Sequence, residues 1–414
     1  MVPVLTVVVV ILGYGLVSRR LEATVVSGPL VFVVAGIVLG PDGLGLLEDG
    51  MDRGTLRVLA EATLVLLLFT DAIRIDLREL RSNARIPTRL LGIGLPLTIV
   101  LGTVLASVLI EGLTLTEALV LGAVLAPTDA ALGQAVVNDR RVPGRIRQGL
   151  NVESGLNDGL AAPVVTLAVG AAALSAETGG AREMLSFAGR QIGFGILAGV
   201  VVGVAGAWLL RGAAARGWVD GVYRQLVTLA VGVAAFGTAE LVEGNGFVAA
   251  FVAGLGFGAV ARDQCRGAYD FAEDEAQLLA LVTFLAFGVG LAPAWGTVGW
   301  REVTFGVLAL TVVRMLPTGL ALIGAGLRLP TVLFLGWFGP RGLASILFAT
   351  FLVEEQLASG ARLYDIVAVV ASLSVVAHGM SAVPIVGRYS RWAEARLEAS
   401  DAEMGDVYHH PVRK

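Results

Sequence analysis

The sequence predicts an all-α, polytopic membrane protein with about thirteen transmembrane helices. Hydrophobic residues make up 56% of the 414 residues and charged residues only 15%, whereas soluble domains contain about a quarter charged residues. Apolar runs of about 18 or more residues, the length of a membrane-spanning helix, recur along the whole chain. We therefore expect a helical bundle embedded in a bilayer.

The boundaries of each span follow from the charged residues, glycines and prolines that interrupt the apolar runs. Most of these runs are long enough, at 1.5 Å per residue, to cross the apolar part of a bilayer. In chain order, the predicted spans are 2–18, 24–41, 56–73, 88–110, 116–137, 144–173, 184–210, 223–242, 245–261, 275–292, 302–327, 330–353 and 363–387.

The arginines predict how these spans are oriented. Loops that follow odd-numbered spans hold most of them, including Arg19, Arg20, Arg140 and Arg141, and the alternate loops hold few. Since basic residues stay on the cytoplasmic side, the N-terminus is expected outside and the C-terminus inside. Residues 1–387 then form one membrane domain, and residues 388–414 form a short cytoplasmic tail.

Ionisable residues inside the spans are the strongest indication of function. A charge near the bilayer centre costs roughly 3 kcal/mol, so it usually marks a pathway or an ion pair. Acids outnumber arginines here, which predicts a candidate cation site. The buried polar set is Glu61, Asp71, Thr128, Asp129, Glu153, Ser154, Asn157, Asp158, Arg314 and Arg341.

The segment NVESGLNDGLAAP at 151–163 provides the first half of this site. On a helix, Ser154 and Asp158 share one face, and Glu153 and Asn157 share the adjoining stripe. Asp158 lies about 20 Å into its span, near the bilayer midplane. Carboxylate, hydroxyl and carbonyl oxygens are the ligands that hard cations prefer.

The segment APTDAALG at 126–133 provides the second half, because its proline should break span five. A matching break is predicted at LGWFGPRGLAS in span twelve, around Arg341. Broken helices expose backbone carbonyls that can bind cations in a cavity. Two such breaks, seven spans apart, indicate an inverted-repeat transporter with a site near the midplane.

Structural roles compete with functional ones at several positions. Glu61 and Arg314 are expected to form a structural ion pair, and His378 is expected to be a packed, hydrogen-bonded residue. Asp71 lies near the inner end of its span beside Arg74, where an interfacial role and a role at the inner mouth of the site remain equal alternatives.

Together, APTDAALG, ESGLNDGLA and GPRGLAS resemble the monovalent cation/proton antiporter family, in its NhaP-type sodium/proton branch. The resemblance covers nearly the whole chain. It implies an antiporter fold in which spans five and twelve cross, a homodimer with a rigid half and a moving ion-binding half, and a multi-pass location in the cell (inner, cytoplasmic) membrane. Monovalent cations, protons and the lipid bilayer would be its partners. Neither a bound cofactor nor a nucleic-acid partner is expected.

The resemblance also implies roles for individual residues. Asp158 would bind either a proton or the cation, Na⁺ or Li⁺ before K⁺. Asp129, Glu153, Ser154 and the backbone of Thr128 would complete the ion's shell. Asn157 would connect this site to the Glu61–Arg314 pair, and Arg341 would compensate charge where the broken helices cross.

Two details refine the expectation. Most relatives carry glycine shortly after the LLF of span three, whereas this chain has Asp71 there, which leaves sodium and potassium open as the cation. Asparagine at 157, and the absence of lysine before Lys414, predict electroneutral exchange of one cation for one proton.

Other classes of protein fit less well. An aspartyl intramembrane protease would use Asp129 and Asp158, but TD and ND stand at these positions where its YD and GxGD motifs would be needed. A rhomboid-like protease would need GxSG, where this chain has VESG, although Ser154 and His378 are both present. A channel would need a repeated filter or a pore-lining ring, and neither is seen. We therefore expect a transporter and not an enzyme.

Overall fold

The computed structural model describes residues 2–22, 24–47, 53–74, 85–129, 132–133, 136, 139–176, 181–261, 266–354 and 359–397. These residues form helices joined by turns and short loops, and they contain no strand. The predicted all-α class is confirmed over this part of the chain.

The first half of the chain contains α1 (Val2–Glu22), α2 (Gly28–Leu39), α3 (Arg53–Arg74), α5 (Arg85–Arg89), the π-helical turn η1 (Leu90–Gly94), α6 (Leu95–Leu109), α7 (Leu115–Val124), α9 (Gly144–Ala176) and α10 (Ala181–Ala215). The second half contains α11 (Gly221–Leu241), α12 (Gly246–Ala261), α13 (Arg266–Val289), α14 (Leu291–Thr297), α15 (Trp300–Leu310), α16 (Val312–Ala321), α17 (Leu329–Trp337), α18 (Leu343–Glu354) and α19 (Gly360–Leu397).

A helix, or a run of consecutive helices, lies within the described part of each predicted span. Within the described residues, seven helices are long and apolar enough to cross a membrane, or eight if the bent pair α13–α14 counts as one span. Shorter apolar helices, including α2, α7, α12 and α18, account for several of the remaining ranges. The total of thirteen therefore stays a prediction.

Both predicted breaks are present. α7 ends at Val124, before Pro127, and the second break separates α17 from α18 at residues 338–342. Two further breaks were not predicted: α13 and α14 meet at 46°, and Thr311 separates α15 from α16. α19 also runs on through Leu397, so helix covers residues 388–397 of the predicted tail.

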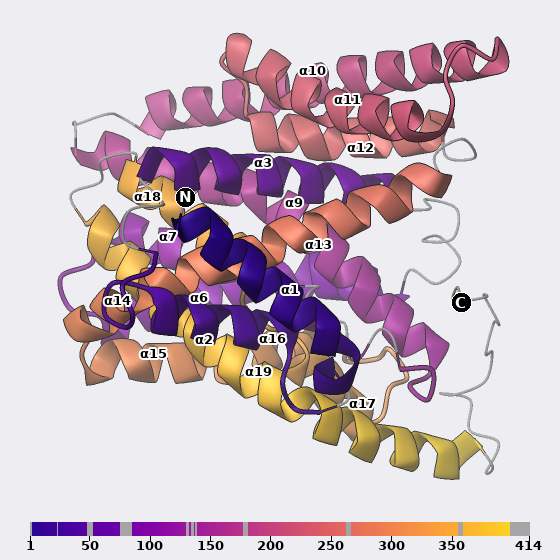
Figure 1. The fold of residues 1–414 in the computed structure, drawn as a ribbon. Helices are drawn as coiled ribbons and strands as arrows, with labels where there is room; N and C mark the ends of the chain where they lie inside the picture. Colours follow the sequence, from indigo (N-terminus) through magenta and orange to yellow (C-terminus); the bar gives the residue numbers. More distant parts are fainter. Residues whose placement is uncertain are drawn as a thin grey trace.

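The helices pack as two groups (Figure 1). α10, α11 and α12 stack along one edge of the molecule, with α3 against α12, and α15, α17 and α19 lie toward the opposite edge. α9 packs against α3 and α12 on one side and against α7 on the other. This central position places the polar segment 151–163 between the two groups.

Small residues set how closely the group formed by α3, α10, α11 and α12 packs. At Gly199 and Gly203 of α10, a Cβ would collide with the backbone of α12, and at Gly254 and Gly258 of α12 it would collide with carbonyl oxygens of α3. Glycines one turn apart let helix backbones approach closely where lipid provides no hydrophobic drive for association. These contacts hold the C-terminal half of α3, which carries Asp71, firmly against α12.

Candidate ion site at the crossing of two broken helices

The two broken segments cross through their non-helical parts. After α7 the chain continues without helix through residues 126–129, and after α17 it does so through residues 338–342. The Asp129 amide donates to the Pro340 carbonyl over 2.8 Å. Pro127 has no amide hydrogen and disfavours helix at Ala126, which explains why the helix stops here.

Each crossing segment provides a charge for a helix end in the other. The buried Arg341 guanidinium donates through Nη1 to Ala126 O at 2.8 Å and to Pro127 O at 2.9 Å, just beyond the C-terminus of α7. Asp129 Oδ2 accepts from the amide of Leu343, the first residue of α18, at 2.6 Å. A cation at a helix C-terminus and an anion at an N-terminus are both stabilising, so the predicted compensating role fits Arg341.

α9 presents the next group of polar residues to this crossing. Asn157 Nδ2 donates to Thr128 Oγ1 at 2.6 Å, and the hydroxyls of Thr128 and Ser154 lie 3.3 Å apart. Both hydroxyl groups belong to buried residues. The structure thus brings together three of the predicted residues, and Asn157 contacts Thr128, not a distant ion pair.

Asp158 of α9 has little local compensation for its charge. Its side chain is partly buried, and its Oδ1 is covered yet has no hydrogen-bond partner among the described residues. The carboxylates of Asp129 and Asp71 and the guanidinium of Arg341 are its Coulombic neighbours. A covered carboxylate oxygen without a partner is costly unless a proton or a cation joins it.

Glu153 has a different partner from the one expected. Arg314 donates to it from Nη1 to Oε1 at 2.5 Å and from Nη2 to Oε2 at 2.9 Å, and both side chains are buried. This corrects the expected Glu61–Arg314 pair, and it commits both oxygens of a predicted cation ligand to a guanidinium. The reason is spatial: Glu153 of α9 lies within ion-pair distance of Arg314 of α16, whereas partly exposed Glu61 lies on α3, whose main contacts are with α12 and α13.

Asp71 lies close to the same site. A Cβ placed on Gly155 would be 3.7 Å from Asp71 Cβ and 3.9 Å from its Cγ, so this side chain of α3 packs directly on α9. Gly155 is one turn before Asp158, and the two share a helix face. Asp71 thus lies beside the site, and its role there stays a prediction.

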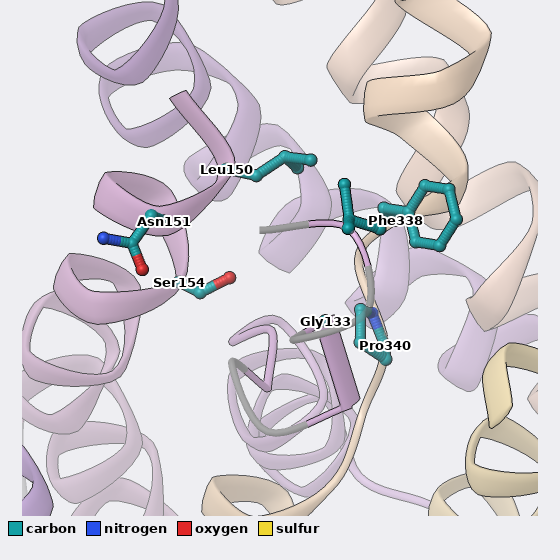
Figure 2. A pocket seen from close by; sticks show the side chains of 7 residues that line it. Gly133, Leu150, Asn151, Ser154, Phe338 and Pro340 are labelled. Atoms are coloured by element: carbon teal, nitrogen blue, oxygen red, sulfur yellow. The ribbon is translucent and has the colours of Figure 1, made fainter. Parts of the chain in front are cut away.

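A small pocket adjoins these residues between α9 and the two breaks. Its lining consists of Gly133, Val136, Leu150, Asn151, Ser154, Phe338 and Pro340. Figure 2 shows Leu150 and Ser154 projecting from α9 toward Gly133, Phe338 and Pro340, while Asn151 points away from them. The Ser154 hydroxyl therefore borders a small cavity that lies toward the N-terminal end of α9.

The loop before α9 is fixed by an ion pair outside the spans. Arg141 donates to Asp139 from Nε at 3.0 Å and from Nη2 at 2.7 Å. These hydrogen bonds hold the pKa of Asp139 below its usual range, against the opposing effect of partial burial.

Three residues that join the crossing were not predicted as part of the site. Ser345 Oγ donates to Val124 O at 2.8 Å, and Ser374 and His378 of α19 contact the α17–α18 break. His378 was expected to be packed and hydrogen-bonded, which is confirmed. A histidine and two serines in apolar spans were visible signals, but nothing in the sequence indicated which helices they would meet.

A helical membrane bundle with two broken helices that cross at charged residues defines a class of secondary transporters. Within that class, the chain belongs to the sodium/hydrogen exchanger family, since residues 4–388 match the model described as "Sodium/hydrogen exchanger, transmembrane". The resemblance inferred from the sequence motifs is thereby confirmed.

Individual relatives agree with this placement. The chain is similar to the K(+)/H(+) antiporter NhaP2 of Shewanella oneidensis, with 28% identity over 81% of this chain and 58% of that one. It is also similar to the K(+)/H(+) antiporter NhaP of Alkalimonas amylolytica, with 26% identity over 92% and 64%. The chain thus spans about three fifths of the length of the curated relatives it matches.

A yeast protein and a solved structure extend the comparison. The Na(+)/H(+) antiporter 2 of Zygosaccharomyces rouxii is 25% identical over 68% of this chain and 39% of its own length. The fold matches the sodium proton antiporter MjNhaP1 of Methanocaldococcus jannaschii at pH 8, with a TM-score of 0.74, 17% identity, and coverage of 92% of this chain and 97% of that one. The predicted antiporter fold is confirmed.

Proposed function

We propose that the chain is a secondary active transporter that exchanges a monovalent cation for a proton across a cell membrane. The observation that carries this proposal is the covered Asp158 oxygen, which has no hydrogen-bond partner in the part of the chain that the structure describes, beside the Thr128 and Ser154 hydroxyls at the helix crossing. These oxygen ligands suit a hard monovalent cation. A proton on Asp158 would serve the same electrostatic need, so the two compete for one site.

Within this proposal, Asp158, Ser154 and Thr128 bind the cation directly. Asp129 and Glu153 flank them, because Asp129 accepts from the N-terminus of α18 and Glu153 is paired with Arg314. The relatives named as K(+)/H(+) antiporters support potassium as the cation, and the yeast relative named for Na(+) supports sodium. Sodium, lithium and potassium are therefore all tested.

The decisive experiment measures cation-driven pH change in proteoliposomes that contain the purified protein. Wild type is expected to move protons on addition of at least one cation, and Asp158→Asn is expected to abolish this while remaining folded. Asp42→Asn is the matched control, because Asp42 is an exposed aspartate away from the crossing. Exchange retained by Asp158→Asn would remove Asp158 from its central role.

We propose one-for-one, electroneutral exchange. Glu153 and Arg314 cancel each other, Asn157 carries no charge, and Asp129 and Arg341 each serve a helix end. Asp158 is then the carboxylate whose occupant changes during transport. Clamping the membrane potential should leave the steady-state ion gradient unchanged, and a gradient that follows the potential would contradict this stoichiometry.

We further propose that Asp71 adjusts cation affinity without adding to the transported charge, because it packs on Gly155 and acts electrostatically on Asp158. Asp71→Asn keeps the shape and removes the charge, and we expect a roughly tenfold rise in apparent KM for the cation. Gly155→Ala is the packing control, since its methyl group would lie at an ordinary contact distance. If both variants raise the apparent KM equally, the rise is due to packing, and the proposed role of the Asp71 charge is wrong.

Two rival functions make different predictions. A channel would pass the cation without a coupled proton flux, which the same vesicles would reveal. A Ser/His protease would need Ser154 close to His378, but the Ser154 hydroxyl contacts Thr128, and the His378 ring contacts Ser374 and Trp337. These contacts favour transport over hydrolysis.

The homodimer is also part of this proposal and rests on the family resemblance. Native mass spectrometry of the protein released from detergent or nanodiscs should show twice the mass of one chain. A single-chain mass under conditions that preserve exchange would contradict it.

A further inference from the structure

Two polar residues of α19, one helical turn apart, hold both sides of the α17–α18 break. Ser374 Oγ accepts from the Arg341 amide at 2.6 Å, and His378 Nε2 lies 3.0 Å from Trp337 O, the last carbonyl of α17. His378 Nδ1 lies 3.1 Å from Ser374 Oγ and 3.0 Å from Ser374 O. Both side chains are fully buried.

One arrangement of hydrogens gives both nitrogens of a neutral imidazole a partner. Nε2 donates to Trp337 O, and Nδ1, which faces both the hydroxyl and the carbonyl oxygen of Ser374, accepts from the hydroxyl. With the hydrogen on Nδ1 instead, Nε2 and Trp337 O would be two acceptors in contact. Ser374 Oγ in turn accepts from Arg341 N. The result is one directional chain, from the Arg341 amide through Ser374 and His378 to Trp337 O.

This chain closes the break into a ring. Its two ends, Trp337 and Arg341, are the residues between which α17 stops and α18 has not yet begun. The His378 ring also lies beside the Trp337 indole, with 5.1 Å between centroids, and Trp337 Nε1 donates to Ser381 of α19 at 3.0 Å. The backbone of Arg341 is therefore fixed from α19, while its guanidinium reaches Ala126 O and Pro127 O of the other broken segment.

We propose that Ser374 and His378 are positioning residues of the ion site: they fix the backbone of Arg341, and through Arg341 the carbonyls and the carboxylate of segment 126–129 beside Asp158. The inference rests on the proposed cation exchange and adds residues that act on the site without touching the cation. If the break were looser, the carbonyls and the carboxylate of segment 126–129 would shift relative to Asp158. Cation binding would then weaken.

Two variants test the chain at separate points. His378→Phe keeps an aromatic ring against Trp337 but removes both ring nitrogens, and Ser374→Ala removes the acceptor of the Arg341 amide. Each is expected to raise the apparent KM for the cation roughly tenfold, the loss that follows from one buried hydrogen bond left unmade. The kcat measured at saturating cation should fall by a smaller factor than kcat/KM.

Ser372→Ala is the matched control. Ser372 is a buried serine of the same helix that accepts from Trp295 Nε1 at 3.2 Å, away from the crossing. The apparent KM of Ser372→Ala for the cation should stay within about twofold of the wild-type value, because the Trp295–Ser372 contact is independent of the α17–α18 break. A merely structural role for Ser374 and His378 would lower the yield of folded protein and leave KM unchanged, and that result would overturn the proposal.

A spectroscopic test separates this inference from the proposed function. In protein labelled with ¹⁵N-histidine, the resonances lost in His378→Phe identify this residue among the three histidines. They should show a neutral ring with the hydrogen on Nε2, and Ser374→Ala should shift the Nδ1 resonance. The opposite tautomer would refute the chain even if exchange occurs. If the NMR spectra show the expected tautomer but the vesicles exchange no cation, only the proposed transport function is refuted.

Discussion

At the scale of single residues, the site shows that two acids in one short segment can have opposite roles. Glu153 and Asp158 are five positions apart, yet Glu153 is neutralised by a two-point contact with Arg314, and Asp158 keeps a covered oxygen that has no hydrogen-bond partner among the described residues. Sequence alone shows that both acids are costly within a membrane. It does not show which acid meets an arginine, because that depends on which helix faces pack together.

The Glu153–Arg314 pair predicts a large loss of stability when one partner is removed. Glu153→Gln leaves the Arg314 guanidinium buried without a counter-charge, so we expect destabilisation of about 3 kcal/mol. The thermal unfolding midpoint in detergent measures it. The double variant Glu153→Gln/Arg314→Gln should recover part of the loss, because it also removes the unpaired charge. Unchanged stability with a weaker cation affinity would instead make Glu153 a cation ligand.

At the scale of helical elements, the central feature is the exchange of charges between two broken helices. The break in span five was predictable because proline cannot continue a helix, and that in span twelve because Gly-Pro-Arg-Gly interrupts an apolar run. That Asp129 would serve α18 and Arg341 would serve α7 depends on the crossing, which is a contact between segments more than two hundred residues apart.

Gly342 makes this crossing testable. A Cβ at this position would collide with the Asp129 carboxylate, so Gly342→Ala should push Asp129 away from the N-terminus of α18. We expect a loss of about 1–2 kcal/mol, the typical value of a helix N-cap, together with weaker cation binding. Gly237→Ala on α11 is the control, since a Cβ there has no neighbour within 4 Å. Equal unfolding midpoints for the two variants would contradict the tight fit.

At the scale of the whole molecule, the sequence predicted the class and the helices that occupy the described parts of the spans, and it named several residues that meet at the crossing. The class and the helices follow from the length of the apolar runs, because the thickness of the bilayer sets the length of a spanning helix. The count of spans, the bends at Gly290 and Thr311 and the two packing groups did not follow, because they depend on helix-to-helix contacts and on glycines that permit close approach. The Glu61–Arg314 expectation failed for the same reason.

The predicted orientation, with the N-terminus outside, can be tested by cysteine labelling in a Cys265→Ser background. Asp42→Cys lies in the turn after α2 and Trp218→Cys in the loop after α10, and both native residues are exposed. In intact cells, a membrane-impermeant maleimide should label the first variant and label the second only after permeabilisation. The reverse pattern would invert the topology.

Under the proposed one-for-one exchange, the contact between Arg314 and Glu153 would also limit how much work the protein can do. If it keeps Glu153 neutralised throughout the cycle, one-for-one exchange leaves the carrier insensitive to voltage. The proton gradient is then its sole source of energy. One pH unit is worth 1.36 kcal/mol, so each unit of pH difference can sustain about a tenfold difference in cation concentration. A buried ion pair would thus set a thermodynamic ceiling on cation extrusion.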